Sequence, residues 1–181
     1  MKFDAVYYEP AIFDYPLGRQ LREEYRDLPW IPIESHNSIR EMQEKPNDQF
    51  GHMKRNLIAG IRKTHKYVEN HKVSDYLVPY TSSGCTAMCL YCYLVCNYNK
   101  CAYLRLFVNR EQMLDNNIKK GRESGNPLTF EIGSNSDLVL ENTITGNLLY
   151  TIPRFVATTI TQSVEVLTNA VTNVANVMES G

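Results

Sequence analysis

The chain has 181 residues, of which 43% are hydrophobic and 22% are charged, which is typical of a globular protein and excludes a disordered chain. Its formal net charge of −1 excludes a general attraction to nucleic acid, so any such contact must rest on local basic patches. The sequence shows no signal peptide and no apolar run long enough to span a membrane, which predicts a cytoplasmic protein without membrane partners.

Residues 1–75 are predicted to form a small N-terminal α/β region. Residues 3–10 have the β-branched and aromatic content of a strand. Residues 16–28 carry apolar side chains at helical spacing, and Pro16 suits the first turn of a helix.

The rest of that region predicts two more strands. Residues 30–35 form a strand that Pro32 restricts to a sheet edge. Residues 38–49 are polar and predict a loop or a short helix, whereas residues 56–63 are an apolar strand candidate.

A second region begins at residue 76 with a short strand, residues 76–80, that enters a Ser/Gly loop. Residues 110–124 predict a helix whose basic end and Gly121 suggest a C-terminal stop. Residues 128–134 predict a strand that opens into the polar loop SNSD, residues 134–137. This alternation predicts parallel βαβ units, which place both loops at strand ends where ligands bind.

All five cysteines fall between residues 82 and 105. Cys85, Cys89 and Cys92 follow the pattern C-x3-C-x2-C, in which three thiolates can hold three corners of a [4Fe–4S] cluster and leave one iron open. The odd number of cysteines and a reducing compartment disfavour a disulfide knot.

A structural zinc site is the alternative, and it needs four closed ligands. It would have to borrow Cys96, Cys101 or a histidine, none of which shows zinc-finger spacing relative to this loop. The interpretation of Cys96 and Cys101 as small buried residues near the start of a helical region is favoured over a redox or second-metal role.

Tyr91 stands directly before the third cysteine, and this decorated motif resembles the radical S-adenosylmethionine (SAM) signature. With "SSGCTAMCLYCYL", "YLRLFVN" and "TFEIGSNSDLVLENTITGNL" in that order, the chain resembles the spore photoproduct lyase family from about residue 6 to residue 153. "YYEPAIFDYPLG", "ESHNSIR" and "KRNLIAGIRK" resemble the family's leading region. The implied fold is α/β: a small N-terminal α/β region followed by a truncated partial (β/α) radical SAM barrel, which starts over residues 76–153.

The resemblance implies a DNA-repair lyase. Cys85, Cys89 and Cys92 would hold a [4Fe–4S] cluster that chelates SAM and receives an electron from a donor such as ferredoxin or flavodoxin. The resulting deoxyadenosyl radical would abstract hydrogen from the methylene-bridged thymine dimer of damaged spore DNA, and two thymines would be restored. Such an enzyme would work in the cytoplasm of a spore-forming bacterium.

The resemblance also implies roles for four further residues. Ser136 matches a SAM-contacting position, Tyr91 lies near the adenine, and Tyr91 and Tyr93 help to relay the hydrogen atom. Ser134 stands where the family carries a cysteine that donates hydrogen. A serine O–H bond is much stronger than a thiol S–H bond, so repair is expected to be impaired unless another donor substitutes. The alternative is that Ser134 caps the following helix.

The likeness fades after about Ile152, which predicts a truncated or frame-shifted form of the enzyme. The alternative function is a non-catalytic metal-binding or interaction module with a structural cluster or zinc. In the tail, residues 154–181, an apolar stripe predicts an amphipathic packing helix that covers a sheet edge or pairs with another copy. The stripe consists of Ile160, Val164, Leu167, Val171, Val174 and Met178.

Seven basic residues are candidates for contacts with DNA phosphates, although a solvated surface is the favoured interpretation for each. They are Lys54, Arg55, Arg62, Lys63, Lys66, Arg105 and Arg110.

Overall fold

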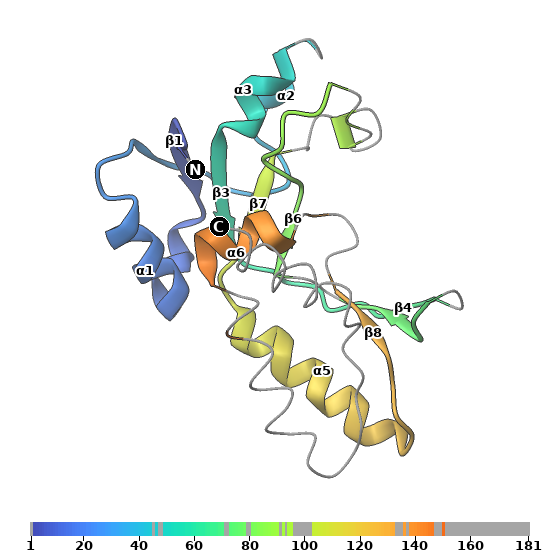
Figure 1. Cartoon of the computed structure of the whole chain (residues 1–181). Coiled ribbons are helices and arrows are strands. Elements are labelled where there is room, and N and C mark those ends of the chain that lie inside the picture. The colour runs from blue at the N-terminus through green and yellow to red at the C-terminus, as the bar shows by residue number, and fades with distance from the viewer. Residues whose placement is uncertain are drawn as a thin grey trace, which may run out of the picture.

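The structure is a computed structural model of the chain (Figure 1). It describes residues 2–44, 46, 49–70, 73–78, 81–90, 92, 94–95, 103–132, 136, 138–146 and 150. The predicted tail at 154–181 therefore lies outside the described residues, as do Cys96 and Cys101. Within the described part, no helix is both long enough and apolar enough to cross a membrane.

A five-stranded sheet forms the centre of the molecule, in the order β2-β1-β3-β7-β6. The first four strands are parallel, and β6 pairs with β7 in the antiparallel sense. Their bounds are Ala5–Tyr8 for β1, Trp30–Pro32 for β2, Asn56–Gly60 for β3, Ser82–Ser83 for β6 and Leu104–Phe107 for β7. The three strands predicted in the N-terminal region are confirmed, and β2 lies at the sheet edge, where Pro32 does not interrupt a central ladder.

Both faces of this sheet are covered, which explains why its strands are apolar without strict alternation. On one face, Leu57 and Leu106 pack in a cluster with Leu17 of α1 and Ile144 of α6. On the other face, Ile58 packs with residues of α2, α3 and the segment before them. The covering elements are η1 (Pro10–Asp14), α1 (Pro16–Glu24), α2 (Arg40–Gln43), α3 (Phe50–Lys54) and α6 (Leu138–Thr145).

A second, smaller sheet has the order β4-β5-β8 and lies beside helix α5 (Figure 1). Strands β5 and β8 are parallel, and α5 lies between them in the sequence, so the predicted parallel unit is confirmed. The bounds are Val68–Glu69 for β4, Tyr76–Leu77 for β5, Arg110–Ser124 for α5 and Phe130–Glu131 for β8.

The predicted helix end at Gly121 is wrong. Helix α5 continues to Ser124, and Gly125 terminates it with φ of 68° in the left-handed region. Gly121 is instead a buried residue inside the helix, and the left-handed Gly125 is the residue that ends it.

Strand β7 was not predicted. It follows the cysteine loop in sequence, yet it pairs with β3 on one side and with β6 on the other. The five-stranded sheet is therefore built from both the 1–75 region and the 76–153 region.

Candidate functional site

Two loops that are far apart in the sequence meet at one end of strand β6. Gly84 follows β6 with φ of 86°, a left-handed conformation that glycine adopts without strain. Gly84 forms a parallel β-bridge with Ser136, which belongs to the SNSD loop. The expectation that the cysteine loop and the SNSD loop lie together at strand ends is thus confirmed.

The three cysteines of the motif are all free and lie on this loop. Cys85 and Cys92 are half-buried, whereas Cys89 is exposed. The Ala87 N–H donates a hydrogen bond of 3.3 Å to Cys85 Sγ. Among the described residues, no three His, Cys, Asp or Glu side chains gather closely enough to hold a metal ion, so the three thiols share a loop without converging on one point.

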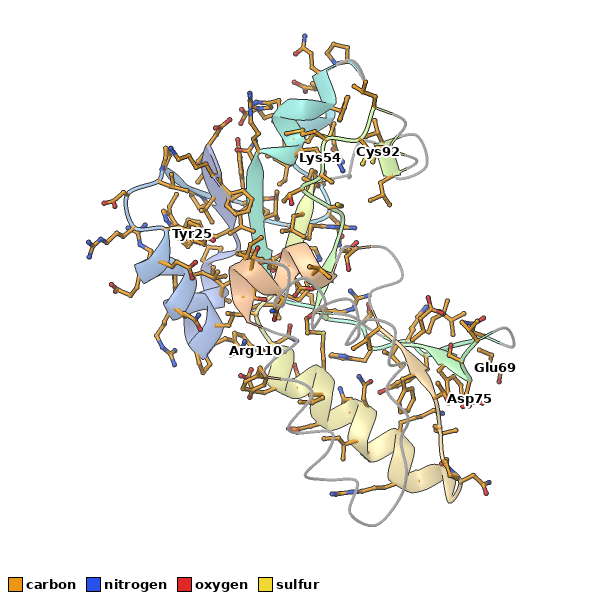
Figure 2. The ribbon with its side chains drawn as sticks, viewed as in Figure 1. Tyr25, Lys54, Glu69, Asp75, Cys92 and Arg110 are labelled. Carbon is orange, nitrogen blue, oxygen red and sulfur yellow. The ribbon has the colours of Figure 1, made fainter. Side chains whose placement is uncertain are left out.

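Lys54 joins the N-terminal region to this loop. It is the last residue of α3, its side chain is only 1% exposed, and Nζ lies 3.4 Å from Cys92 Sγ. Figure 2 shows the two side chains next to each other. A buried ammonium is costly unless an anion or an acceptor compensates it, and the Cys92 sulfur occupies that position. The interpretation of Lys54 as a solvated surface residue is wrong.

The environment of Cys92 favours its thiolate. Burial alone would raise the pKa of this thiol, but the Val95 N–H and the Lys54 charge, with the Leu94 N–H, outweigh burial and hold the pKa below the ordinary value of 9.0. Thiolate is the form that binds metal. Three free thiols on one loop, one of them with a lowered pKa, are soft donors that fit an iron–sulfur cluster.

Two buried hydroxyl groups lie unsatisfied in this neighbourhood. Ser136 Oγ and Thr86 Oγ1 have no hydrogen-bond partner within the described part of the chain. Buried polar atoms are nearly always paired, so such orphans indicate the place of a polar ligand or a water molecule. Ser136 was expected to contact SAM, and its orphaned hydroxyl beside Gly84 is compatible with that role. Thr86 had no sequence signal.

A buried carboxylate fixes the strand that leads into the loop. Glu141 of α6 is 1% exposed and accepts hydrogen bonds from Thr81 Oγ1 at 3.0 Å and from Ser82 Oγ at 2.5 Å. This contact joins α6 to β6 directly before the cysteines, and sequence reasoning missed it because the partners are distant in the chain.

Tyr91, Tyr93 and Ser134 lie outside the described residues, so their expected roles in hydrogen transfer stay predictions.

The other candidate basic residues have different environments. Arg55 pairs with Asp4 at 2.9 Å, and Arg110 lies over the Tyr150 ring, 4.0 Å from its centroid. Arg62, Lys63 and Arg105 line one pocket. Lys66 is exposed.

Comparison with known proteins gives one consistent family. The family model for spore photoproduct lyase matches residues 1–178. The spore photoproduct lyase of Bacillus subtilis (strain 168) is 34% identical over 155 residues, which cover 83% of this chain and 45% of the relative. That of Geobacillus sp. (strain Y412MC61) is 32% identical over 139 residues, covering 74% of this chain and 40% of the relative.

Solved structures that are similar to this chain belong to the same family. A spore photoproduct lyase complexed with dinucleoside spore photoproduct matches with a TM-score of 0.74 and 28% identity, over 83% of this chain and 45% of that one. A double mutant of spore photoproduct lyase with bound AdoMet and dinucleoside spore photoproduct matches equally well, with a TM-score of 0.74. The chain thus spans less than half the length of these relatives.

Proposed function

This chain belongs to the spore photoproduct lyase family, and we propose that it provides the cluster- and SAM-binding part of a radical SAM lyase that reverses the spore photoproduct to two thymines. The observation that carries this proposal is the Gly84–Ser136 bridge, which places the loop that carries three free cysteines beside the orphaned, buried Ser136 hydroxyl. The cysteine loop offers soft thiol ligands for iron, and Ser136 across the bridge offers a hydrogen-bonding group for the polar end of SAM.

The chemistry that a [4Fe–4S] cluster and SAM supply when bound is a one-electron reduction and a carbon-centred radical. The chain's own residues bind and orient. Cys85, Cys89 and Cys92 are the proposed iron ligands, and the Val95 N–H and Lys54 together lower the pKa of the Cys92 thiol, which favours the thiolate that binds iron. A ferredoxin or flavodoxin is the proposed source of the electron.

Ser136 and Thr86 are the proposed polar contacts of the cofactor. Their hydroxyl groups are already buried, so a ligand that accepts their hydrogen bonds removes a desolvation cost of roughly 1–3 kcal/mol for each group. Glu141 acts behind them as a positioning residue, since it holds Thr81 and Ser82 at the base of the loop.

The paired strands β5 and β8, with β6 and the Gly84–Ser136 bridge, are proposed to be the start of the radical SAM partial barrel. The β5–β8 pairing and the Gly84–Ser136 bridge are parallel, as the barrel requires, whereas β6 itself pairs with β7 in the antiparallel sense. Strand β6 leads into the cysteine loop and β8 leads into the SNSD loop. The damaged strand of DNA is the proposed macromolecular substrate.

Tyr91 and Tyr93 are proposed to relay a hydrogen atom, and Ser134 occupies the donor position. Because a serine O–H bond is stronger than a thiol S–H bond, this chain is expected to return hydrogen slowly. A Ser134→Cys variant should raise the yield of clean thymine from a dimer-containing oligonucleotide. An equal yield from both proteins would contradict the assignment of position 134.

The proposal is tested by anaerobic reconstitution of the full chain with iron and sulfide, followed by dithionite and SAM. We expect a brown protein with four irons and production of 5′-deoxyadenosine. Replacement of Cys85, Cys89 and Cys92 by alanine should remove both signals, whereas Met88→Ala on the same loop should keep them. A protein that binds one zinc and no iron would contradict the proposal and favour a structural module.

A further inference from the structure

A second polar site is lined by Ser83 of β6 and by residues at and just beyond the carboxyl ends of β3 and β7. The structure has a pocket of about 260 Å³ there. Its floor is buried and includes Glu9, His36 and Phe107, whereas Asn37 and Lys63 stand at an exposed rim. This volume is below the roughly 300–1,000 Å³ typical of pockets for drug-sized ligands, so a small chemical group fits it.

Glu9 is the carboxylate in this lining, and its oxygens are engaged from within the protein. Oε1 accepts hydrogen bonds from the His36 N–H at 3.0 Å and from His36 Nδ1 at 2.7 Å. Oε2 accepts from the Ile61 N–H at 3.0 Å. These three donors hold Glu9 as an ionised carboxylate with a lowered pKa, and its single negative charge offsets one of the three positive charges that Arg62, Lys63 and Arg105 bring to the pocket.

The guanidinium of Arg105 is fixed by two hydrogen bonds in a position from which it can bind an anion. Its Nη1 donates to Asn37 Oδ1 and its Nη2 donates to Ser83 Oγ, both at 2.8 Å. Both acceptors are neutral, and Nε is buried with no partner in the described part of the chain. A guanidinium fixed in this way keeps its full charge and has already lost its conformational freedom.

Two more cations and several hydroxyl groups complete the pocket. Arg62 packs over the Phe107 ring, with its guanidinium carbon 4.9 Å from the centroid, and Lys63 follows at the rim. Ser35, Thr64 and Ser83 add hydroxyl groups to the lining. Burial lowers the pKa of His36, the charge of Glu9 opposes this, and the charges of Arg105 and Arg62 add to the lowering, so the two guanidinium groups lie close enough to the floor to act on it.

We propose that this pocket binds a phosphate group, with Arg105 and Arg62 as its fixed contacts and Lys63 at its mouth. Arginine forks and hydroxyl donors are the groups that recognise the tetrahedral oxygens of phosphate. The pocket shares Ser83 with the strand that leads into the cysteine loop, so the source of the phosphate is the backbone of the DNA strand held at that loop. This choice of source rests on the proposed function.

The test measures binding by the full chain without iron, SAM or a thymine dimer. A fluorescent single-stranded oligothymidylate reports DNA binding by anisotropy, and calorimetry reports inorganic phosphate binding. Lys63→Gln and Arg105→Gln remove one pocket charge each. Lys66→Gln is the matched control, because Lys66 is an exposed basic residue three positions beyond Lys63 that does not line the pocket.

We expect each pocket variant to weaken DNA binding about tenfold, as the loss of one charge-assisted contact does. The slope of log K against log salt should fall by about 0.7 for each. Lys66→Gln should change neither as strongly. If inorganic phosphate binding is lost in the variants while DNA binding is unchanged, the pocket is a phosphate site filled from free phosphate.

If the pocket variants weaken the binding of neither DNA nor inorganic phosphate more than Lys66→Gln does, the proposal is overturned. Lys63→Gln keeps the test valid should Arg105→Gln fail to fold, since Lys63 is exposed. Because no cluster or SAM is present, failure here leaves the radical SAM proposal standing. Absence of deoxyadenosine in the reconstitution experiment would likewise leave the pocket standing.

Discussion

Strand β3 and the cysteine loop lie close together but are stabilised in different ways. All five residues of β3 are buried, and the sheet around it is covered on both faces. On the loop, Cys89 and Met88 are exposed and Leu90 is 91% exposed. The sheet is held by burial of apolar surface, whereas the loop gains little from burial and depends on the groups it binds. A rigid scaffold therefore presents a reactive loop that contributes little to stability.

The largest expected effect is that of a substitution at Cys89 on the loop. We expect Cys89→Ala to abolish iron binding and SAM cleavage, because a required ligand is lost. Since this side chain is exposed, the free energy of unfolding of the iron-free protein should change by less than about 0.5 kcal/mol. Iron analysis and urea denaturation measure the two effects. Retention of a full complement of iron would show that Cys89 is not a ligand.

A substitution in the sheet should have the opposite result, a loss of stability without a loss of iron binding. Ile58 of β3 is fully buried, and Ile58→Ala should cost about 2–5 kcal/mol of unfolding free energy through the cavity it leaves. The folded fraction should still bind iron as the parent protein does. Urea denaturation is the measurement, and Val68→Ala, at an exposed position, is the control. A loss below 1 kcal/mol would mean that the core relaxes around the missing atoms.

Lys54 belongs to the scaffold but acts on the loop, through its contact with Cys92. In Lys54→Met the pKa of the Cys92 thiol should rise toward its ordinary value of 9.0, since an adjacent positive charge is removed. Alkylation of Cys92 by iodoacetamide at neutral pH should therefore slow severalfold in the iron-free protein. Peptide mass spectrometry resolves this cysteine from the others. Lys66→Met is the control, and the same slowing in both variants would contradict a specific Lys54 effect.

The smallest expected effect is a fall in the stability of the folded protein at acidic pH, caused by Glu9 and His36. Hydrogen bonds and charge from His36 and Ile61 outweigh burial and lower the pKa of Glu9 below 4.5, and burial lowers the pKa of His36 below 6.5. Both groups bind protons more readily when unfolded, so stability should fall as the pH drops below about 6.5, and again below about 4.5.

Thermal melts from pH 8 down to about pH 2.5 check this dependence, because the Glu9 part lies below its ordinary pKa of 4.5. A His36→Gln variant should lose the share of the upper part that His36 contributes and keep that of His65, whose pKa is lowered by burial and by the Arg62 charge, whereas the parent protein keeps both parts. Stability that rises on acidification would reverse the sign assigned to the pair.

Much of the fold was predictable because local patterns determined it. Apolar runs gave β1 and β3, Pro32 gave an edge strand, and the rule for parallel strands brought Ser136 beside the cysteine loop. Strand β7 was missed because its pairing depends on β3 and β6, which are distant in sequence.

The candidate site was predictable only in part. The cysteine motif identified the proposed ligands, but Lys54 looked like any basic surface residue, since no periodic pattern marks a lysine that folding will bury. Glu141 was missed for the same reason, because its partners Thr81 and Ser82 come from another element.

The contact between Lys54 and Cys92 has a consequence for protein engineering. The two residues come from the two predicted regions, residues 1–75 and residues 76–153, and the Lys54 side chain is buried where they meet. A chimera that joins residues 2–75 to a foreign cysteine loop must therefore keep a cation at 54 and a thiol at 92 together. Without its partner, either residue becomes a defect at the junction, so the pair makes the boundary at residue 75 a poor place to recombine.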